Sequence, residues 1–256
     1  MAAESQKIVV FGAAGWVGRA VLTSLETHGH TIRASDFGPE AWKTYEEFDG
    51  SWSAGEVVHC DISDYDQVDA AIDGMDAIIH TAVLGSKGGG YGAGSDAPWL
   101  VNLKGLWNVL ESARRRDCRR VVHMGSCQVE HPRGIFFTAD VRRPDASLYA
   151  VGKRLQEELC RQFHEGHGLS IVVIRPASIV DSELGVSGHM TPSQDTVGNV
   201  CRHDLAEACH RALISDLELE ILHAASHPDA DRYCDMARTR QVLGMEFNRR
   251  IATTGG

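Results

Sequence analysis

Short runs rich in apolar residues recur along the chain, and longer stretches with apolar residues at helical spacing separate them. The runs cover residues 8–11, 31–35, 57–60, 77–80, 120–124 and 170–174. Short apolar strands that alternate with amphipathic helices are typical of a parallel sheet covered on both faces. The pattern therefore predicts an α/β fold with a doubly wound, Rossmann-type parallel sheet, and ligands in such sheets bind beyond the carboxyl ends of the strands.

The first run leads straight into three glycines at a spacing of three, at the start of the first predicted helix. In a dinucleotide site Gly12 would permit the tight turn, Gly15 would let backbone N–H groups approach a pyrophosphate, and Gly18 would let the helix pack against the strand. The helix N-terminus favours the phosphate charge. The residues assigned to this cofactor turn are Gly12, Ala14, Gly15, Trp16, Val17 and Gly18.

Asp36 follows the second run, about twenty residues beyond the glycines, where a carboxylate can accept hydrogen bonds from an adenosine ribose. A carboxylate repels a 2′-phosphate, and the next residues, Phe37 and Gly38, offer no cation to hold one. The sequence therefore predicts NAD rather than NADP as the cofactor. An ordinary solvated aspartate in a turn is the alternative at this position.

Small or polar residues also follow the later strands, at the predicted ligand edge of the sheet. Asp61 and Ile62 can meet an adenine with a carboxylate and an apolar wall, and a helix N-cap at Asp61 or Ser63 is an equally good interpretation. The residues that let a cofactor lie close to the backbone after the fourth run are Thr81, Ala82 and Val83. The candidates for substrate contact after the fifth run are Ser126, Cys127 and Gln128.

Tyr149 and Lys153 lie four residues apart in a predicted helix and therefore on one face of it. An ammonium group close to a phenol favours the phenolate and lowers the tyrosine pKa from about 10 toward the range of a general base. Ser126 can then hold a substrate oxygen while Tyr149 moves the proton. An isolated pair of this kind is usually an ordinary exposed helical pair, but the glycine turn upstream favours the catalytic interpretation.

Composition narrows the class of partner. The chain has 256 residues, 43% of them hydrophobic, and can bury a full core. Its formal net charge of −10 disfavours binding to nucleic acid or to an anionic membrane, so a small-molecule substrate is the expected partner. No apolar run is long enough to span a bilayer and no signal-peptide core opens the chain, so we expect a cytoplasmic location.

The seven cysteines are scattered and include no Cys-x-x-Cys pair, so we expect reduced thiols rather than a disulfide framework. One group of potential metal ligands is close in sequence, but its spacing matches no zinc pattern. That group is Cys201, His203, Asp204, Cys209 and His210. No metal site is predicted.

These motifs resemble the extended branch of the short-chain dehydrogenase/reductase superfamily, the NAD-dependent epimerase/dehydratase family, over nearly the whole chain. The matching positions are Gly12, Gly15 and Gly18; Asp61 and Ile62; an Asn-x-x-Gly-x-x-Asn helix at residues 102–110; Ser126, Tyr149 and Lys153; Arg175 and Pro176; and residues 202–206. The resemblance implies proton transfer by Tyr149, control of the cofactor ribose and of the tyrosine pKa by Lys153, and a supporting role for Asn102. It also implies that Ser126 binds the substrate oxygen and that the nicotinamide of NAD lies near Pro176, Ala177, Ser178 and Ile179.

The sequence departs from this family in its C-terminal part. Only about eighty residues follow Arg175, whereas similar nucleotide-sugar epimerases carry a larger lobe there. The compact layout resembles uronate dehydrogenases, with a similar Arg-x-x-Ser at residues 175–178, but their arginine for the substrate carboxylate has no counterpart, since no Lys or Arg lies between Ala177 and Cys201. We therefore expect a neutral polyhydroxy or ketone substrate. An anionic substrate could instead be bound by a cation from another loop, and the candidates are Lys87, Arg133, Arg142 and Arg143.

Residues 85–95 form a glycine-rich insertion directly after the fourth run. Ordering so many glycines costs conformational entropy, so this segment is either a loop that cofactor or substrate orders or a surface loop without a role. Lys87 and Tyr91 are its candidates for substrate contact. We expect residues 1–176 to form the NAD-binding core and residues 177–256 a small substrate-binding region that is not an independent domain.

Three functions fit these features. The first is net hydride transfer between NAD and a carbohydrate-like alcohol or carbonyl. The second is a redox-neutral sugar or sugar-nucleotide epimerase or dehydratase that keeps its NAD bound. The third is a cofactor sensor without catalysis, which would have no need of Ser126, Tyr149 and Lys153.

The resemblance also implies a homodimer that pairs through the helices carrying Asn102 and Tyr149. Apolar Leu155, Leu159 and Phe163 follow Tyr149 at helical spacing. They form either part of that interface or a stripe that faces the sheet of the same chain, because an amphipathic helix must bury its apolar side.

Overall fold

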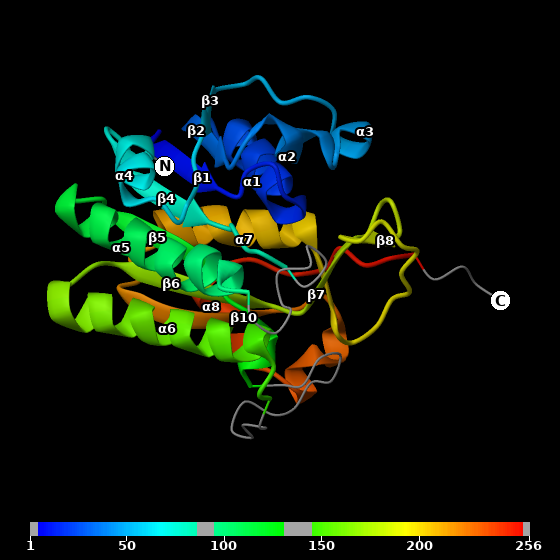
Figure 1. The fold of residues 1–256 in the computed structure, drawn as a ribbon. Helices are drawn as coiled ribbons and strands as arrows, with labels where there is room; N and C mark the ends of the chain where they lie inside the picture. The colour runs from blue at the N-terminus through cyan, green and yellow to red at the C-terminus, as the bar shows by residue number, and fades with distance from the viewer. Residues whose placement is uncertain (1–4, 86–94, 131–144, 253–256) are drawn as a thin grey trace.

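The computed structural model describes residues 5–85, 95–130 and 145–252. In these residues seven strands form one parallel sheet in the order β10-β6-β5-β4-β1-β2-β3 (Figure 1). The strands are β1 (Lys7–Phe11), β2 (Thr31–Asp36), β3 (Glu56–His59), β4 (Ala77–His80), β5 (Arg120–Met124), β6 (Ile171–Pro176) and β10 (Leu219–Ala224). The strand order reverses at β1, which lies between β2 and β4, so the predicted doubly wound fold is confirmed.

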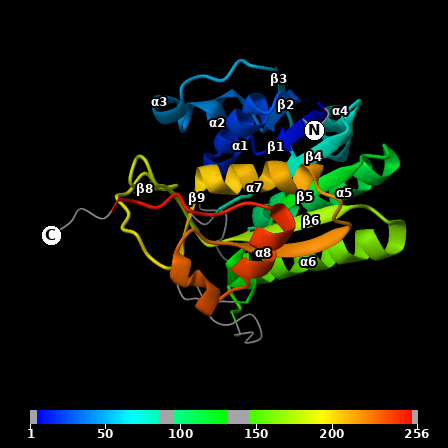
Figure 2. The same ribbon diagram turned by 180° about the vertical axis from the view of Figure 1, so that it is seen from behind.

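Helices cover both faces of this sheet. The longer ones are α1 (Trp16–Thr27), α4 (Tyr65–Ile72), α5 (Gly105–Arg115), α6 (Leu148–His167), α7 (Arg202–Ile214) and α8 (Met236–Leu243). α1, α7 and α8 pack on one face and α4, α5 and α6 on the other, as Figures 1 and 2 show from opposite sides. The short elements are α2 (Pro39–Lys43), α3 (Glu46–Asp49), a π-helical turn η2 (Trp99–Lys104), and the 3-10 turns η3 (Cys127–Val129) and η4 (Pro228–Arg232). Among the described helices, none is both long and apolar enough to cross a membrane.

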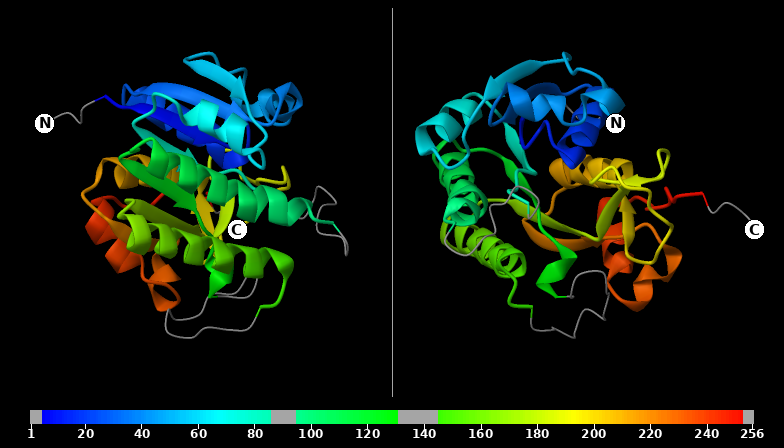
Figure 3. Two further views of the ribbon diagram at one scale, coloured as in Figure 1. Left: turned by 60° about the vertical axis from the view of Figure 1, so that its left-hand side comes forward. Right: turned by 45° about the vertical axis from the view of Figure 1, so that its right-hand side comes forward.

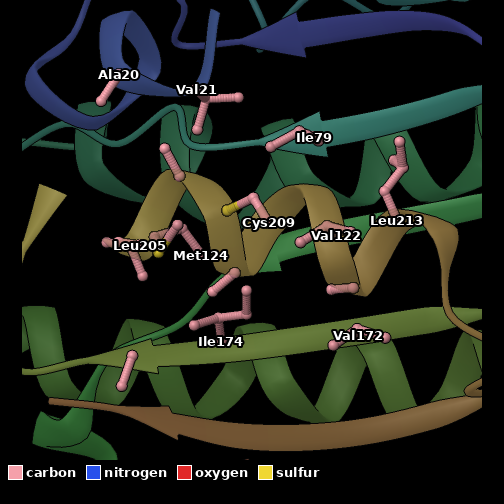
Figure 4. Packing of buried hydrophobic residues seen from close by; sticks show 14 of the residues in the cluster. Ala20, Val21, Ile79, Val122, Met124, Val172, Ile174, Leu205, Cys209 and Leu213 are labelled. Carbon is pink, nitrogen blue, oxygen red and sulfur yellow. The ribbon is translucent and has the colours of Figure 1, made fainter. Parts of the chain in front are cut away.

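The packing of α7 shows how the sequence pattern builds the core. Leu205, Cys209 and Leu213 recur every four residues and therefore lie on one side of the helix, in the same buried cluster as Val122 and Ile174 of the sheet (Figure 4). Full burial of one such aliphatic side chain contributes about 1.5–3 kcal/mol. All seven cysteines are described, and each is a buried free thiol, as in the expected reduced state.

The C-terminal part of the chain is built into the core. β10 pairs with β6 along its whole length, from Leu219 opposite Ile171 to Ala224 opposite Pro176, and α7 covers one face of the sheet. A second sheet, ordered β8-β7-β9, begins directly beyond β6 (Figure 3). Its strands are β7 (Ser178–Asp181), β8 (Val186–Ser187) and β9 (Asn199–Cys201). The seven-stranded sheet therefore includes a strand from residues 177–256, and the division of roles between residues 1–176 and 177–256 stays a prediction.

Candidate active site

The glycine turn between β1 and α1 has the close packing that its sequence predicts. Gly12 has a φ of +79°, and a Cβ there would lie 2.5 Å from the backbone nitrogen of Ala82. A Cβ on Gly18 would overlap the carbonyl oxygen of Gly12. At Gly15 a Cβ would meet only that same oxygen, at 3.2 Å. Gly12 and Gly18 are therefore required by the fold, whereas Gly15 leaves space beside the N-terminus of α1, as a pyrophosphate needs.

Asp36 lies against this turn. Its Oδ2 accepts a hydrogen bond from the backbone N–H of Ala14 at 2.9 Å, and its Oδ1 accepts one from Phe37 at 2.9 Å. Burial raises the pKa of Asp36, and the two backbone donors act against that rise. The carboxylate thus borders the glycine turn, while the Phe37 side chain beside it is 71% exposed.

Residues after β4 contact the glycine turn on the side opposite Asp36. Thr81 Oγ1 donates to the carbonyl oxygens of Phe11 and Gly12, at 2.9 and 3.1 Å. The backbone of Ala82 fills the space that a larger residue at position 12 would need, and Val83 is 43% exposed. The small residues after β4 therefore pack against the cofactor turn.

The two residues after β3 have different environments. Asp61 is exposed, and its Oδ1 accepts hydrogen bonds from both the backbone N–H and the hydroxyl of Ser63. Ile62 is buried, with its backbone oxygen bonded to the Asn108 amide. The N-cap of α4 is Asp64, not Asp61 or Ser63. Asp61 therefore keeps an exposed carboxylate at the ligand edge, while Ile62 belongs mainly to the core.

Asn102 lies in the π-helical turn before α5, a distortion that is frequent at functional sites. Its side-chain oxygen accepts from the backbone N–H of Leu84 at 2.7 Å, and its amide donates to the Leu84 carbonyl at 3.2 Å. Its own carbonyl accepts from Gln156 on α6. Asn102 therefore links the chain after β4 to α6, the helix that carries Tyr149.

Lys153 joins α6 to the carboxyl end of β5. Its buried Nζ donates to the carbonyl of Met124 at 2.6 Å and lies 5.9 Å from the centre of the Tyr149 ring. Ser126 follows two residues after Met124, and its Oγ accepts the backbone N–H of Gln128 at 3.1 Å. Burial lowers the pKa of Lys153 to about 8. The structure thus brings the predicted tyrosine–lysine pair to the strand end that precedes Ser126.

Cys127, the next residue after Ser126, is buried. Its thiol is buried in the core and donates to the carbonyl of Arg175 at 3.2 Å. Burial raises the pKa of the thiol, so it stays protonated. Cys127 belongs to the buried core cluster, and the substrate role expected for it stays a prediction. Gln128 is half-buried beside it.

The remaining candidates lie after β6 or outside the described residues. Pro176 ends β6, Ala177 donates its backbone N–H to Ala224, and Ser178 is exposed at the start of β7, followed by half-buried Ile179. The candidates that fall outside the described residues are Lys87, Tyr91, Arg133, Arg142 and Arg143.

Arg175, which the sequence analysis placed in a family motif, is a buried structural cation. Its guanidinium holds Glu157 of α6 through two hydrogen bonds of 2.7 Å and Glu130 through a third of 2.5 Å. Glu130 also accepts from His223 of β10 at 3.1 Å. Glu130, Glu157 and His223 could not be identified from the sequence pattern. The one clue in the sequence is the position of Glu157, four residues after Lys153 and hence on the same face of the helix.

A second buried group that the sequence analysis missed is a histidine pair. His80 and His123 face each other on β4 and β5 with their Nδ1 atoms 3.0 Å apart, so one Nδ1 donates and the other accepts. Burial lowers the pKa of both, that of His80 to about 3, and the charge of Lys153 adds to the effect. Both rings are therefore neutral at physiological pH.

Comparison with known proteins gives matches over this same region. A model of the NAD dependent epimerase/dehydratase family matches residues 8–193. The 3 beta-hydroxysteroid dehydrogenase/Delta 5-->4-isomerase of Mycobacterium tuberculosis is 31% identical over 183 residues, which cover 69% of this chain and 48% of that protein. Uronate dehydrogenase of Pseudomonas syringae pv. tomato is 28% identical over 182 residues, which cover 67% of this chain and 59% of that one. The chain thus spans about half the length of these relatives.

Among solved structures, a mutant uronate dehydrogenase from Agrobacterium tumefaciens complexed with NAD is similar with a TM-score of 0.74. It is 23% identical, and the match covers 95% of this chain and 84% of that one. At this identity the likeness concerns the fold, and it extends the similarity to the C-terminal strands and helices.

Proposed function

Because this chain belongs to the NAD dependent epimerase/dehydratase family, we propose that it is an NAD-dependent oxidoreductase acting on a carbohydrate-like alcohol or carbonyl. The observation that carries the proposal is the hydrogen bond from Lys153 to Met124, which holds α6 and its Tyr149 at the strand end before Ser126. That strand end lies at the same edge of the sheet as the glycine turn and Asp36. Cofactor turn and proton-transfer residues therefore share one edge.

The residues present fit NAD. The open side of Gly15 and the N-terminus of α1 would hold the pyrophosphate, and Asp36 would hold the adenosine ribose. NAD, when bound, accepts or donates the hydride. Tyr149 moves the proton of the substrate hydroxyl, Lys153 favours the phenolate by its charge, and Ser126 binds the substrate oxygen.

We propose a neutral substrate, a polyol, sugar or ketone without a carboxylate or phosphate. Arg175 is fully engaged by Glu157 and Glu130, and Arg154 donates to the carbonyls of Val129 and Asp145. Neither guanidinium is available to an anionic substrate. In the part of the chain that the structure describes, neither of these two arginines could therefore pair with a buried substrate anion, and a buried anion without a paired cation is strongly disfavoured.

The test is a screen of sugars, polyols and ketones with NAD or NADH, followed by absorbance of the nicotinamide. We expect stoichiometric accumulation of NADH with an alcohol substrate, or its consumption with a carbonyl. Conversion of a sugar or sugar nucleotide without net change in NADH, by protein purified with NAD bound, would favour the epimerase or dehydratase alternative. Activity restricted to uronates or sugar phosphates would contradict the neutral substrate.

The assembly and the location are further parts of this proposal. α5 and α6 lie side by side, and Trp107 and Leu155 on them are 38% and 40% exposed, so a homodimer formed through these helices would cover them. Phe163 lies in a core cluster of its own chain and Leu159 packs against that cluster, which favours the alternative that these residues face their own chain. Sedimentation as a monomer at micromolar concentration would contradict the dimer. The cytoplasmic location stays a prediction.

A further inference from the structure

The ion pairs of Arg175 join segments that are far apart in the sequence. Glu130 follows η3, four residues after Ser126, and Glu157 lies on α6, eight residues after Tyr149. Arg175 itself is at the end of β6, with side-chain exposures of 8% for Arg175, 2% for Glu157 and 18% for Glu130. One buried guanidinium thus connects the loop of Ser126 to the helix of Tyr149 and Lys153.

We propose that Arg175, Glu157 and Glu130 form a positioning unit for proton transfer, in which Arg175 locks the Ser126 loop onto α6 and Glu157 supplies a fixed negative charge one helical turn from Lys153. This rests on the proposed function, because it assigns these residues to the same Ser126, Tyr149 and Lys153. The proposal requires no contact between the substrate and any of these three residues.

The geometry supports a positioning role over a purely stabilising one. A buried ion pair often contributes little net stability, because desolvation of both charges offsets their attraction. Arg175 uses a bidentate contact to Glu157 and a separate contact to Glu130, which fixes direction as well as distance. Reacting groups must be held within about 0.5 Å of the productive geometry. The hydrogen bonds of Arg175 to both Glu157 and Glu130 meet that requirement. They fix the Ser126 loop relative to α6, although these two segments are far apart in the sequence.

The charges around Lys153 give Glu157 a second effect. Burial lowers the pKa of Lys153 to about 8, and Glu157 raises it. Among the described residues, the other titratable groups near the ammonium are His80 and His123 from the sheet, both neutral, and the Cys160 thiol, whose pKa burial raises. Glu157 is therefore the anion that keeps Lys153 cationic, and a cationic Lys153 is what favours the Tyr149 phenolate.

The test measures ionisation of Tyr149 by ultraviolet absorbance of tyrosinate, taken as the difference between each protein and the same protein with Tyr149→Phe. Glu157→Gln should raise the midpoint by about one pH unit, a tenfold change in the ionisation constant. Among the described residues, Arg175→Gln leaves the buried Glu157 only Arg161 as an ion-pair partner, at 4.0 Å, so the Glu157 carboxyl should take up a proton and the midpoint should also rise. A midpoint that rises in Glu157→Gln and Arg175→Gln but stays in place in Arg175→Lys, which keeps the cation, is the signature of charge, since structural loosening would move the midpoint in all three variants.

The matched control is Glu158→Gln, because Glu158 is the next residue on α6 but is 54% exposed and pairs with Arg161 near the surface. It should leave the midpoint unchanged. An unchanged midpoint in folded Glu157→Gln, or equal shifts in Glu157→Gln and Glu158→Gln, would overturn the electrostatic half of the proposal.

The locking half is tested by amide hydrogen exchange in residues 125–130. Arg175→Lys keeps the charge but cannot make both contacts, so exchange in this loop should accelerate at least tenfold while the Tyr149 midpoint stays near that of the unmodified protein. Arg175→Lys also serves if Arg175→Gln fails to fold. Unchanged exchange would overturn the lock.

The outcomes separate this inference from the proposed function. A Tyr149 that ionises only near pH 10 in the unmodified protein would contradict the assignment of Tyr149 and Lys153 themselves, where about 10 is the ordinary phenol value. A lowered Tyr149 midpoint that ignores Glu157 and Arg175 would leave that assignment intact and overturn only the positioning unit.

Discussion

Two regions lie on one edge of the sheet but are held together in different ways. They are the cofactor turn at residues 12–18, where we propose that NAD binds, and the proton-transfer corner around Ser126, Tyr149 and Lys153, where we propose that the proton moves. The cofactor turn is held mainly by contacts to backbone: Gly12 and Ala13 donate their backbone N–H groups to Ser35 at 3.0 and 3.1 Å, and Asp36 accepts from the backbone N–H of Ala14. The proton-transfer corner draws on β5, α6, β6 and β10, and buried charges hold it.

This difference implies different sensitivities. Backbone contacts at van der Waals distance make the cofactor turn sensitive to added volume, since neighbouring backbone cannot move aside. Buried ion pairs make the proton-transfer corner sensitive to charge, since an unpartnered buried ion is strongly disfavoured. Substitutions that add volume should therefore affect mainly the cofactor turn, and substitutions that change charge should affect mainly the proton-transfer corner.

The largest effect is expected from a substitution that impairs only the proton-transfer corner. Tyr149→Phe removes the transferable proton but little cofactor contact, so turnover should fall more than about a hundredfold, while NAD affinity changes only a few-fold. Steady-state kinetics with the best substrate from the screen and NAD titration measure the two. Tyr65→Phe, on α4, is the matched control. Near-normal turnover of Tyr149→Phe would contradict its role as acid and base.

A volume change should break the cofactor turn instead. Gly18→Ala places a Cβ onto the Gly12 carbonyl oxygen, which should lower the free energy of unfolding by about 3 kcal/mol, measured by urea denaturation. The control is Gly166→Ala on α6, where a Cβ meets nothing within 4 Å and should stabilise by about 0.5–1 kcal/mol. Equal effects of the two substitutions would contradict the close packing at Gly18.

The buried histidines should make stability depend on acid. The pKa of His80 is lowered to about 3 by burial and that of His210 to about 4, so below pH 6.5 the unfolded chain binds protons that the folded protein refuses. The contribution of these histidines to the free energy of unfolding should therefore be constant above about pH 7 and fall toward pH 5, by about 2 kcal/mol per histidine.

Denaturation at pH 7 and pH 5 measures this effect. His210→Gln should reduce the pH dependence, whereas His59→Gln, at an exposed position, should not. Equal stability at the two pH values would show that these rings are not held neutral.

The smallest expected effect concerns cofactor choice. We expect NAD to bind more tightly than NADP, and Asp36→Ala to narrow the difference by about tenfold, since one hydrogen bond to a charged group contributes about 1.5 kcal/mol or more. Asp36→Asn separates the causes, because it keeps an acceptor for Ala14 but removes the charge that repels a 2′-phosphate. Equal affinities in the unmodified protein would remove the role given to Asp36.

Local pattern was sufficient for much of this protein. The alternation of apolar strands with amphipathic helices predicted the doubly wound sheet, and the spacing of Gly12, Gly15 and Gly18 predicted a turn that the structure contains. The four-residue spacing of Tyr149 and Lys153 placed both on one helical face. Each of these depends on backbone geometry over a few residues, which sequence spacing specifies directly.

Only the tertiary structure decided which distant groups meet. The sequence did not show that Arg175 is engaged by Glu130 and Glu157, that Cys127 turns into the core, or that β10 extends the sheet beyond residue 176. Such contacts depend on how helices and strands dock across long loops. The same charged or apolar side chain can contact a ligand, a neighbouring helix or solvent. Its partner is decided only by the packed fold, which determines which of these lies within reach.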